Sequence, residues 1–125
     1  MVATYLTDEM IKSGANLVER MDAAGLEPEA AFWLYDAESE NWKLLIADAK
    51  IGQSGPRDMY RQIQKLLSQV SGLSLDEVSL TTPSSSVVTL LRGALRTGPG
   101  ISGIRFKNNV VNGTVIEDAY IYRLR

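Results

Sequence analysis

The sequence predicts an α+β fold with a single mixed β-sheet of about five strands packed by three helices, in the order α-β-β-α-β-α-β-β. Three segments carry apolar residues at helical spacing, and short apolar runs between and after them are typical of strands. Glycine and proline residues separate these segments. At 125 residues the chain suits one core, so residues 1–125 are expected to form a single domain.

The first helix is expected to begin at Thr7, a residue type that caps helix N-termini. Asp8 and Glu9 follow, and their charges suit the positive end of a helix dipole. Apolar residues recur at helical spacing from 10 to 21, and Gly25 is the expected left-handed cap.

Residues 30–35 and 42–47 read as the two strands of a β-hairpin, because both are aromatic and aliphatic and a polar segment separates them. A register with Tyr35 opposite Trp42 places aromatic residues on one face and leaves the other face apolar as well. Both faces of this hairpin are therefore expected to need a cover.

The second helix is expected between Pro56 and Gly72, and the next strand at 78–81. These two elements and the strand before them form a candidate right-handed parallel crossover. The third helix is expected to begin among Ser84, Ser85 and Ser86 and to reach Arg96.

The rest of the chain is expected to be strands. They lie at 101–107, around Val110 and Val111, and within 115–124, with a turn at Asn112-Gly113.

Composition excludes several kinds of site. The chain has no cysteine and no histidine, so disulfides, thiol nucleophiles, thiolate or imidazole metal sites and a histidine base are all absent. The sequence reveals no catalytic residue, and we expect no catalytic metal and no nucleotide cofactor. The N-terminus lacks a signal-peptide pattern and no apolar run is long enough to cross a bilayer, so a cytoplasmic protein without membrane contact is expected.

The net charge of −2 hides an asymmetry: residues 1–49 sum to −7 and residues 50–125 to +5. A chain divided in this way can bind an anion with its second half or pair with itself head to tail. The alternative is that folding interleaves the two halves and cancels their fields.

Two motifs match known patterns only in part. Residues 98–103 have the letters G-x-G-x-x-G, but a helix precedes them and a strand follows, whereas dinucleotide binding needs the reverse. Glu19, Asp36 and Asp48-Ala49-Lys50 are similar to the acids and D-x-K of PD-(D/E)xK nucleases. In a simple hairpin Asp36 and Asp48 lie at opposite ends, roughly 20 Å apart, so solvated acids at strand ends are the favoured interpretation.

The best anion-site candidate is a run from 78 to 116 that holds four bases and no acid: Arg92, Arg96, Arg105 and Lys107. Arg92 and Arg96 are four residues apart and share a helix face if the helix continues that far. The alternative is a solvated basic face, and the low overall charge disfavours a nucleic-acid-binding domain. Arg105 or Lys107 is also expected to pair with Glu117 or Asp118 on a neighbouring strand.

The aromatic side chains suggest an interface. Trp33, Tyr35 and Trp42 share a hairpin face, and Tyr120 and Tyr122 share a face of the last strand. Packing in the core is the main alternative, and stacking of a planar ligand is another.

The function stays unknown at this level. The leading hypothesis is a small non-enzymatic binding or scaffold module that acts through protein-protein contacts and self-associates as a homodimer. One alternative is a nucleic-acid or phosphate-binding module that uses the basic patch. Another is an enzyme whose carboxylate or lysine site is assembled only by the fold.

Overall fold

The computed structural model describes residues 5–111 and 113–125. It has the predicted α+β class, with a single five-stranded sheet in these residues and the spatial order β3-β2-β1-β5-β4. The β2–β3 pair is parallel, as expected for the crossover, and the other neighbouring pairs are antiparallel. The elements in chain order are α1 (Asp8–Ala23), β1 (Ala30–Asp36), β2 (Asn41–Ala47), α2 (Ala49–Ser54), α3 (Arg57–Leu67), the 3-10 helix η1 (Leu75–Glu77), β3 (Val78–Thr81), α4 (Ser86–Ala94), β4 (Ile104–Val111) and β5 (Thr114–Leu124).

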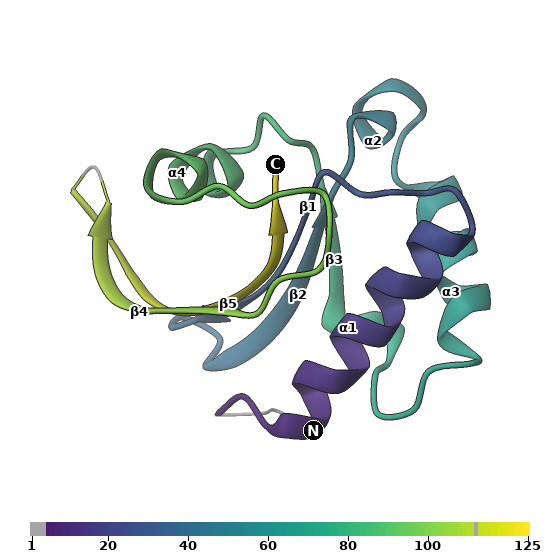
Figure 1. Cartoon of the computed structure of the whole chain (residues 1–125), viewed down its shortest axis with the longest axis horizontal. Helices are drawn as coiled ribbons and strands as arrows, with labels where there is room; N and C mark the ends of the chain where they lie inside the picture. Colours follow the sequence, from purple (N-terminus) through teal and green to yellow (C-terminus); the bar gives the residue numbers. More distant parts are fainter. Residues whose placement is uncertain (1–4, 112) are drawn as a thin grey trace.

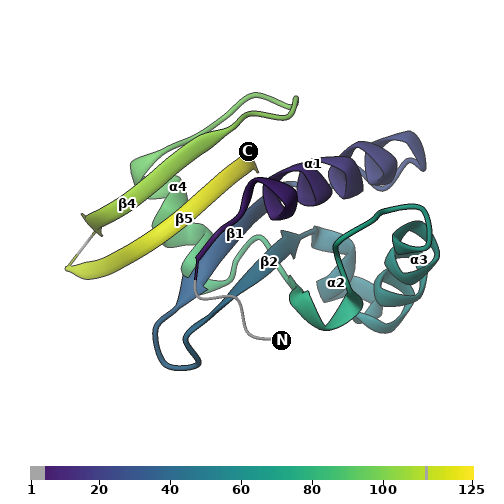
Figure 2. The same ribbon diagram turned by 90° about the horizontal axis from the view of Figure 1, so that it is seen from below.

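The helices divide between the two faces of the sheet (Figures 1 and 2). α1 and α3 lie on one face, over a core that includes Trp33, Trp42 and Tyr122. α4 lies on the other face, within the curve of β4 and β5, and packs against Phe32 and Ile121. Both faces of the β1–β2 hairpin are therefore covered within one chain, as the apolar pattern required. None of the described helices is both long and apolar enough to cross a bilayer.

The predicted hairpin and the first helix are confirmed in detail. Tyr35 lies opposite Trp42 in the β1–β2 register. Thr7 caps α1, with its side chain accepting a hydrogen bond from the amide of Met10, and Gly25 has a φ of +80° after the helix. These features are local in sequence, which is why pattern and capping rules located them.

The sequence prediction missed the short helix α2. Its N-cap is Asp48, whose carboxylate accepts a hydrogen bond from the amide of Lys50. Asp48 is buried, so the interpretation of this acid as a solvated residue at a strand end is wrong. The D-x-K letters are the start of a helix, because a capping aspartate directly follows the last residue of β2.

The third predicted helix is shorter than expected. α4 begins after Ser85, within the predicted serines, but ends at Ala94 and not at Arg96. Thr97 explains the early end: its amide donates to the carbonyl of Leu124, and its hydroxyl accepts from the Leu124 amide. These bonds hold the chain beside the end of β5. The backbone amide of Ser102 also donates to the backbone carbonyl of Tyr122 there. The glycine segment therefore follows a helix and leads into β4, as expected, and β4 begins only at Ile104.

The last turn was expected at Asn112-Gly113. Asn112 lies outside the described residues, and Gly113 has a φ of +81°, a conformation that favours glycine. The flanking valines Val110 and Val115 are paired and exposed.

A β-bulge changes the direction of the last residues of β5. Between Ala31 and Phe32 the β1–β5 register shifts, so Phe32 faces Ile121 while Ala31 faces Arg123. Tyr122 is the extra residue, and beyond it the alternation of side chains is reversed. Leu124 therefore joins the core under α4, whereas unbroken alternation along β5 would place it on the face of Tyr122.

The same bulge turns the buried Arg123 toward the end of α1. Its guanidinium donates two hydrogen bonds to the Asp22 carboxylate, at 2.9 Å and 2.6 Å. It also donates to the carbonyl oxygens of Pro28 and Gly100. One side chain thus ties together the end of α1, the loop before β1 and the glycine segment before β4.

We predict that Asp22→Ala destabilises the fold by about 2–4 kcal/mol, because Arg123 is 2% exposed and would be left as a buried charge without its carboxylate. Urea unfolding monitored by tryptophan fluorescence measures this loss. Asp58→Ala is the control, since it removes an equivalent charge from an exposed pair with Arg61 and should cost under about 1 kcal/mol. Equal losses for the two variants would contradict the anchoring role of Arg123.

A second buried polar group joins α1 to the sheet. The Tyr122 hydroxyl accepts a hydrogen bond from Trp33 Nε1 at 3.0 Å and donates to the carbonyl of Ile11 at 2.6 Å. Gly14 permits this close approach, because a Cβ there would lie 2.4 Å from the Tyr122 hydroxyl. Burial raises the pKa of the Tyr122 phenol well above its ordinary value of 10.0.

We predict that the free energy of unfolding falls as pH rises above about 10, because Tyr122 then ionises in the unfolded chain but stays neutral in the folded one. Tyr122→Phe should lose about 1–2 kcal/mol at pH 7 with its hydrogen bonds, and should show a shallower decline above pH 10. Urea midpoints across this pH range measure both effects. Tyr5→Phe, at an exposed tyrosine, is the control and should keep the slope of the parent protein; an unchanged slope in Tyr122→Phe would refute the assignment.

Candidate functional site

Arg92 and Arg96, two of the four predicted anion-binding residues, line one surface hollow of about 430 Å³. Arg125 and Glu29 complete its lining. The described lining thus consists of three arginines and one glutamate, and we call this site the arginine hollow. The Arg125 guanidinium also donates to the carbonyl oxygen of Glu27 at 3.4 Å.

Arg92 reaches the hollow from the last turn of α4. One of its terminal nitrogens donates to the carbonyl oxygen of Pro83 at 3.2 Å, which holds the side chain in place. Its Nε is buried and has no hydrogen-bond partner in the described part of the chain. A buried N–H without a partner is costly, and because this nitrogen is shielded from solvent it is not a contact point for an entering ligand.

Arg96 lies beyond the end of α4, so the predicted shared helix face does not exist. The two arginines still line one hollow, because Leu95 is already extended and Thr97 is bonded to the end of β5. Arg96 is exposed, and its planar donors are available to solvent or to a ligand.

No sequence pattern indicated that Arg125 and Glu29 belong to the site. They are 96 positions apart and meet because Ala30 pairs with Leu124 across β1 and β5. The amide of Arg125 donates to the carbonyl of Glu29 at 3.0 Å, which extends this pairing by one step. Only the strand register could have located them.

Arg105 and Lys107 do not join this hollow. Arg105 lies opposite Tyr120 and Lys107 opposite Asp118, on the sheet face that carries α1, whereas Arg92 belongs to α4 on the other face. The four predicted residues are therefore separated by the sheet.

Arg105 also bonds to residues outside the hollow. It makes the predicted cross-strand pair, donating two hydrogen bonds to the Asp118 carboxylate, and these bonds raise the pKa of its guanidinium. Its guanidinium also lies 5.7 Å from the ring centre of Trp42.

The aromatic interface candidates are mostly core residues. Trp33, Trp42 and Tyr122 are 0%, 4% and 1% exposed, so a partner cannot reach them. Tyr35 and Tyr120 are partly buried at the border of the same cluster. The core interpretation therefore holds for the first three.

The acids considered for a nuclease-like site are not brought together. Asp36 pairs with Asn41 at one end of the hairpin, while Asp48 follows Ala47 at the other end. Among residues 5–111 and 113–125, no group of three acids is close enough to hold a metal ion.

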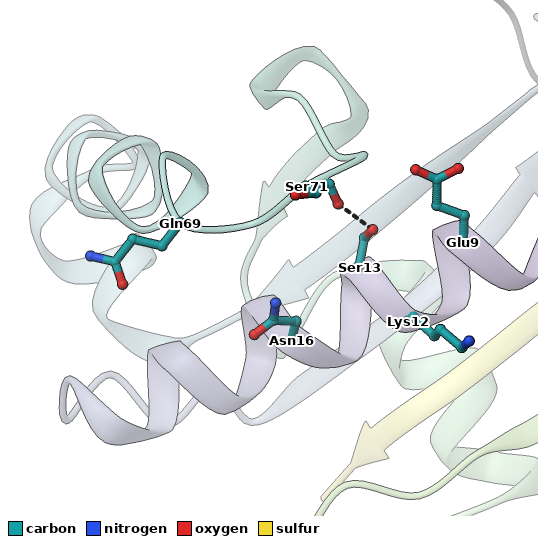
Figure 3. Close-up of a pocket in the computed structure, with 6 residues that line it drawn as sticks. All are labelled: Glu9, Lys12, Ser13, Asn16, Gln69 and Ser71. Atoms are coloured by element: carbon teal, nitrogen blue, oxygen red, sulfur yellow. Dashed lines mark hydrogen bonds between the residues drawn. The ribbon is translucent and has the colours of Figure 1, made fainter.

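A second hollow, of about 400 Å³, lies between α1 and the segment after α3 (Figure 3). Its lining is polar and includes Glu9 and Asn16 of α1 and Gln69 of the facing segment. Ser13 Oγ donates to the carbonyl oxygen of Ser71 at 2.5 Å across it. The Arg20 guanidinium donates to the side-chain oxygen of Gln69, so a second bond joins α1 to the segment after α3. We therefore interpret this groove as the packing boundary of these two segments, and we call it the seam.

No protein-family model, curated protein or solved structure matches this chain. The site must therefore be judged on its own geometry. The arginine hollow is the stronger candidate, because residues from separate segments present like charges to one space.

We predict that Gly72→Ala is more destabilising than Gly25→Ala. Both glycines have φ near +80°, so each substitution carries a backbone cost of about 1–2 kcal/mol. A Cβ at Gly25 meets nothing within 4 Å, but one at Gly72 lies 2.6 Å from Glu9 Oε1 and 3.0 Å from Ser13 Oγ. Thermal melts of both variants test the seam, and equal melting temperatures would show that α1 is not held closely there.

Proposed function

We propose that this protein is a non-enzymatic binding module that holds an acidic segment of a protein partner in the arginine hollow. The observation that carries the proposal is that Arg92, Arg96 and Arg125 line one hollow with a single carboxylate side chain among its described lining residues. Planar guanidinium groups bind carboxylates in a bidentate manner, and such charge-assisted bonds are among the strongest in proteins.

The chemistry of the hollow favours binding over catalysis. Arginine stays protonated in proteins and cannot exchange protons with a substrate. Among the described residues that line the hollow, Glu29 is the only one with a carboxylate side chain, and none has a hydroxyl or an amine. The site therefore offers donors for an anion but no nucleophile beside a base.

An acidic peptide fits the site better than a nucleic acid does. A polynucleotide is bound by a row of cations that neutralises successive phosphates. The hollow holds a compact group of three, and Arg105 is paired with Asp118 on the far side of the sheet. The net charge of −2 also opposes a polyanion at long range.

A cytoplasmic location and self-association belong to the same proposal. The complete lack of cysteine is compatible with a reducing compartment. Since helices cover both faces of the sheet, self-association would use exposed charged groups or the exposed side chains of Val110 and Val115.

We predict that a fluorescein-labelled hexaglutamate peptide binds the protein at about 50 mM salt, where screening is weak. Arg92→Ala combined with Arg96→Ala should weaken binding at least about tenfold, because two charge-assisted contacts are lost. Fluorescence anisotropy measures the affinity. Arg92→Lys with Arg96→Lys keeps the charge but not the planar donors, and should recover only part of the loss.

The control removes the same charge elsewhere. Arg57 and Arg61 are exposed on α3, so Arg57→Ala with Arg61→Ala should change the affinity by less than about twofold. Equal losses for the α3 pair and the hollow pair would show that the peptide senses only net charge. Tighter binding of a single-stranded oligonucleotide, lost in the hollow variant, would favour the nucleic-acid alternative.

A further inference from the structure

The tip of the β1–β2 hairpin is the most concentrated acidic loop in the described structure. Asp36, Glu38 and Glu40 lie within five residues, and all are exposed. Asp36 is occupied inside the loop, since its carboxylate accepts from the Glu38 amide at 3.1 Å and from Ser39 Oγ at 2.8 Å. The carboxylates of Glu38 and Glu40 have no hydrogen-bond or ion-pair partner among the described residues, so they are available to an outside cation.

This acidic tip cannot reach the arginine hollow of its own chain. The hollow lies where β1 begins, because Glu29 precedes Ala30, which pairs with Leu124 next to Arg125. The tip lies where β1 ends, at Asp36. Six residue steps at about 3.3 Å place the two regions roughly 20 Å apart on a rigid central strand. Opposite charges at opposite ends of one strand can meet only between molecules.

We propose that the occupant of the arginine hollow is the hairpin tip of a second copy of this chain. This inference rests on the proposed function, since it names the acidic segment that the hollow binds. Glu38 and Glu40 provide two free carboxylates, and Arg92, Arg96 and Arg125 provide the matching donors. Because Glu38 and Glu40 project from an exposed turn, their carboxylates can enter the hollow of about 430 Å³ without the hairpin strands entering it.

The contact joins two different surfaces, so it is heterologous. Each copy keeps one free tip and one free hollow after it pairs, and association then continues into a ring or an open chain. This differs from a symmetric homodimer, in which one patch meets the same patch of the second copy. It also uses the charge division of the chain, with its acidic first half against its basic second half.

The test uses two variants that each lose one half of the contact. Glu38→Gln with Glu40→Gln removes two negative charges from the tip. Arg92→Ala with Arg96→Ala removes two guanidinium groups from the hollow. Analytical ultracentrifugation at about 50 mM salt should show concentration-dependent oligomers for the parent protein and a mass near 13.7 kDa for each variant alone. An equimolar mixture of the two should give a dimer at about twice that mass and nothing larger, because one intact tip meets one intact hollow and no further contact is left.

Three results would overturn the inference: a parent protein that stays monomeric at every concentration, a mixture that stays monomeric, or single variants that still associate. Association that persists in both variants but is lost in Val110→Thr with Val115→Thr would assign it to the exposed valines instead. Circular dichroism of each variant establishes that it is folded. The hexaglutamate experiment separates the two proposals, since peptide binding through Arg92 and Arg96 in a monomeric protein retains the proposed function and removes only the self-docking.

Discussion

The buried guanidinium of Arg123 is the contact on which the arrangement of the segments depends. It bonds to Asp22 at the end of α1 and to the carbonyls of Pro28 and Gly100, which belong to two separate loops. A charge that is 2% exposed is stable only when its donors are paired, so these segments must be in place together. The contact exists because a bulge in β5 turns Arg123 to the side of α1.

The covering of both sheet faces leaves the ends of the strands as the chemically distinctive surfaces. α1 and α3 bury the aromatic face, with the Tyr122 hydroxyl bonded to Trp33 and to the backbone of α1. α4 buries the opposite face. Most apolar residues are thereby buried within the chain, although Val110 and Val115 stay exposed. Charged residues lie at the two ends of β1, with acids at the hairpin tip and arginines at the arginine hollow.

The arginine hollow and the Arg105 pair show how context decides the role of a base. Arg105 has a carboxylate on the next strand and an indole ring beside it, so its donors are occupied. Arg92 has one carbonyl partner, and the other described residues that line the hollow are two arginines and Glu29. Four bases that look equivalent along the chain are therefore not equivalent in their surroundings, and the binding role that we propose depends on Arg92 and Arg96.

Local patterns by themselves determined most of the elements: the Thr7 cap, the Gly25 stop, the Tyr35–Trp42 register and the parallel crossover follow from spacing and capping over a few residues. The candidate site was only half accessible in this way, since Arg92 and Arg96 are near each other in sequence while Glu29 and Arg125 are not. Tertiary structure decided the remainder. The Thr97 contact with Leu124 ended α4 early, the bulge at Tyr122 reversed the alternation of β5, and the sheet separated Arg105 and Lys107 from Arg92. Each of these depends on which strands pair and in what register, and that choice is made by contacts between residues far apart in the chain, which no local pattern records.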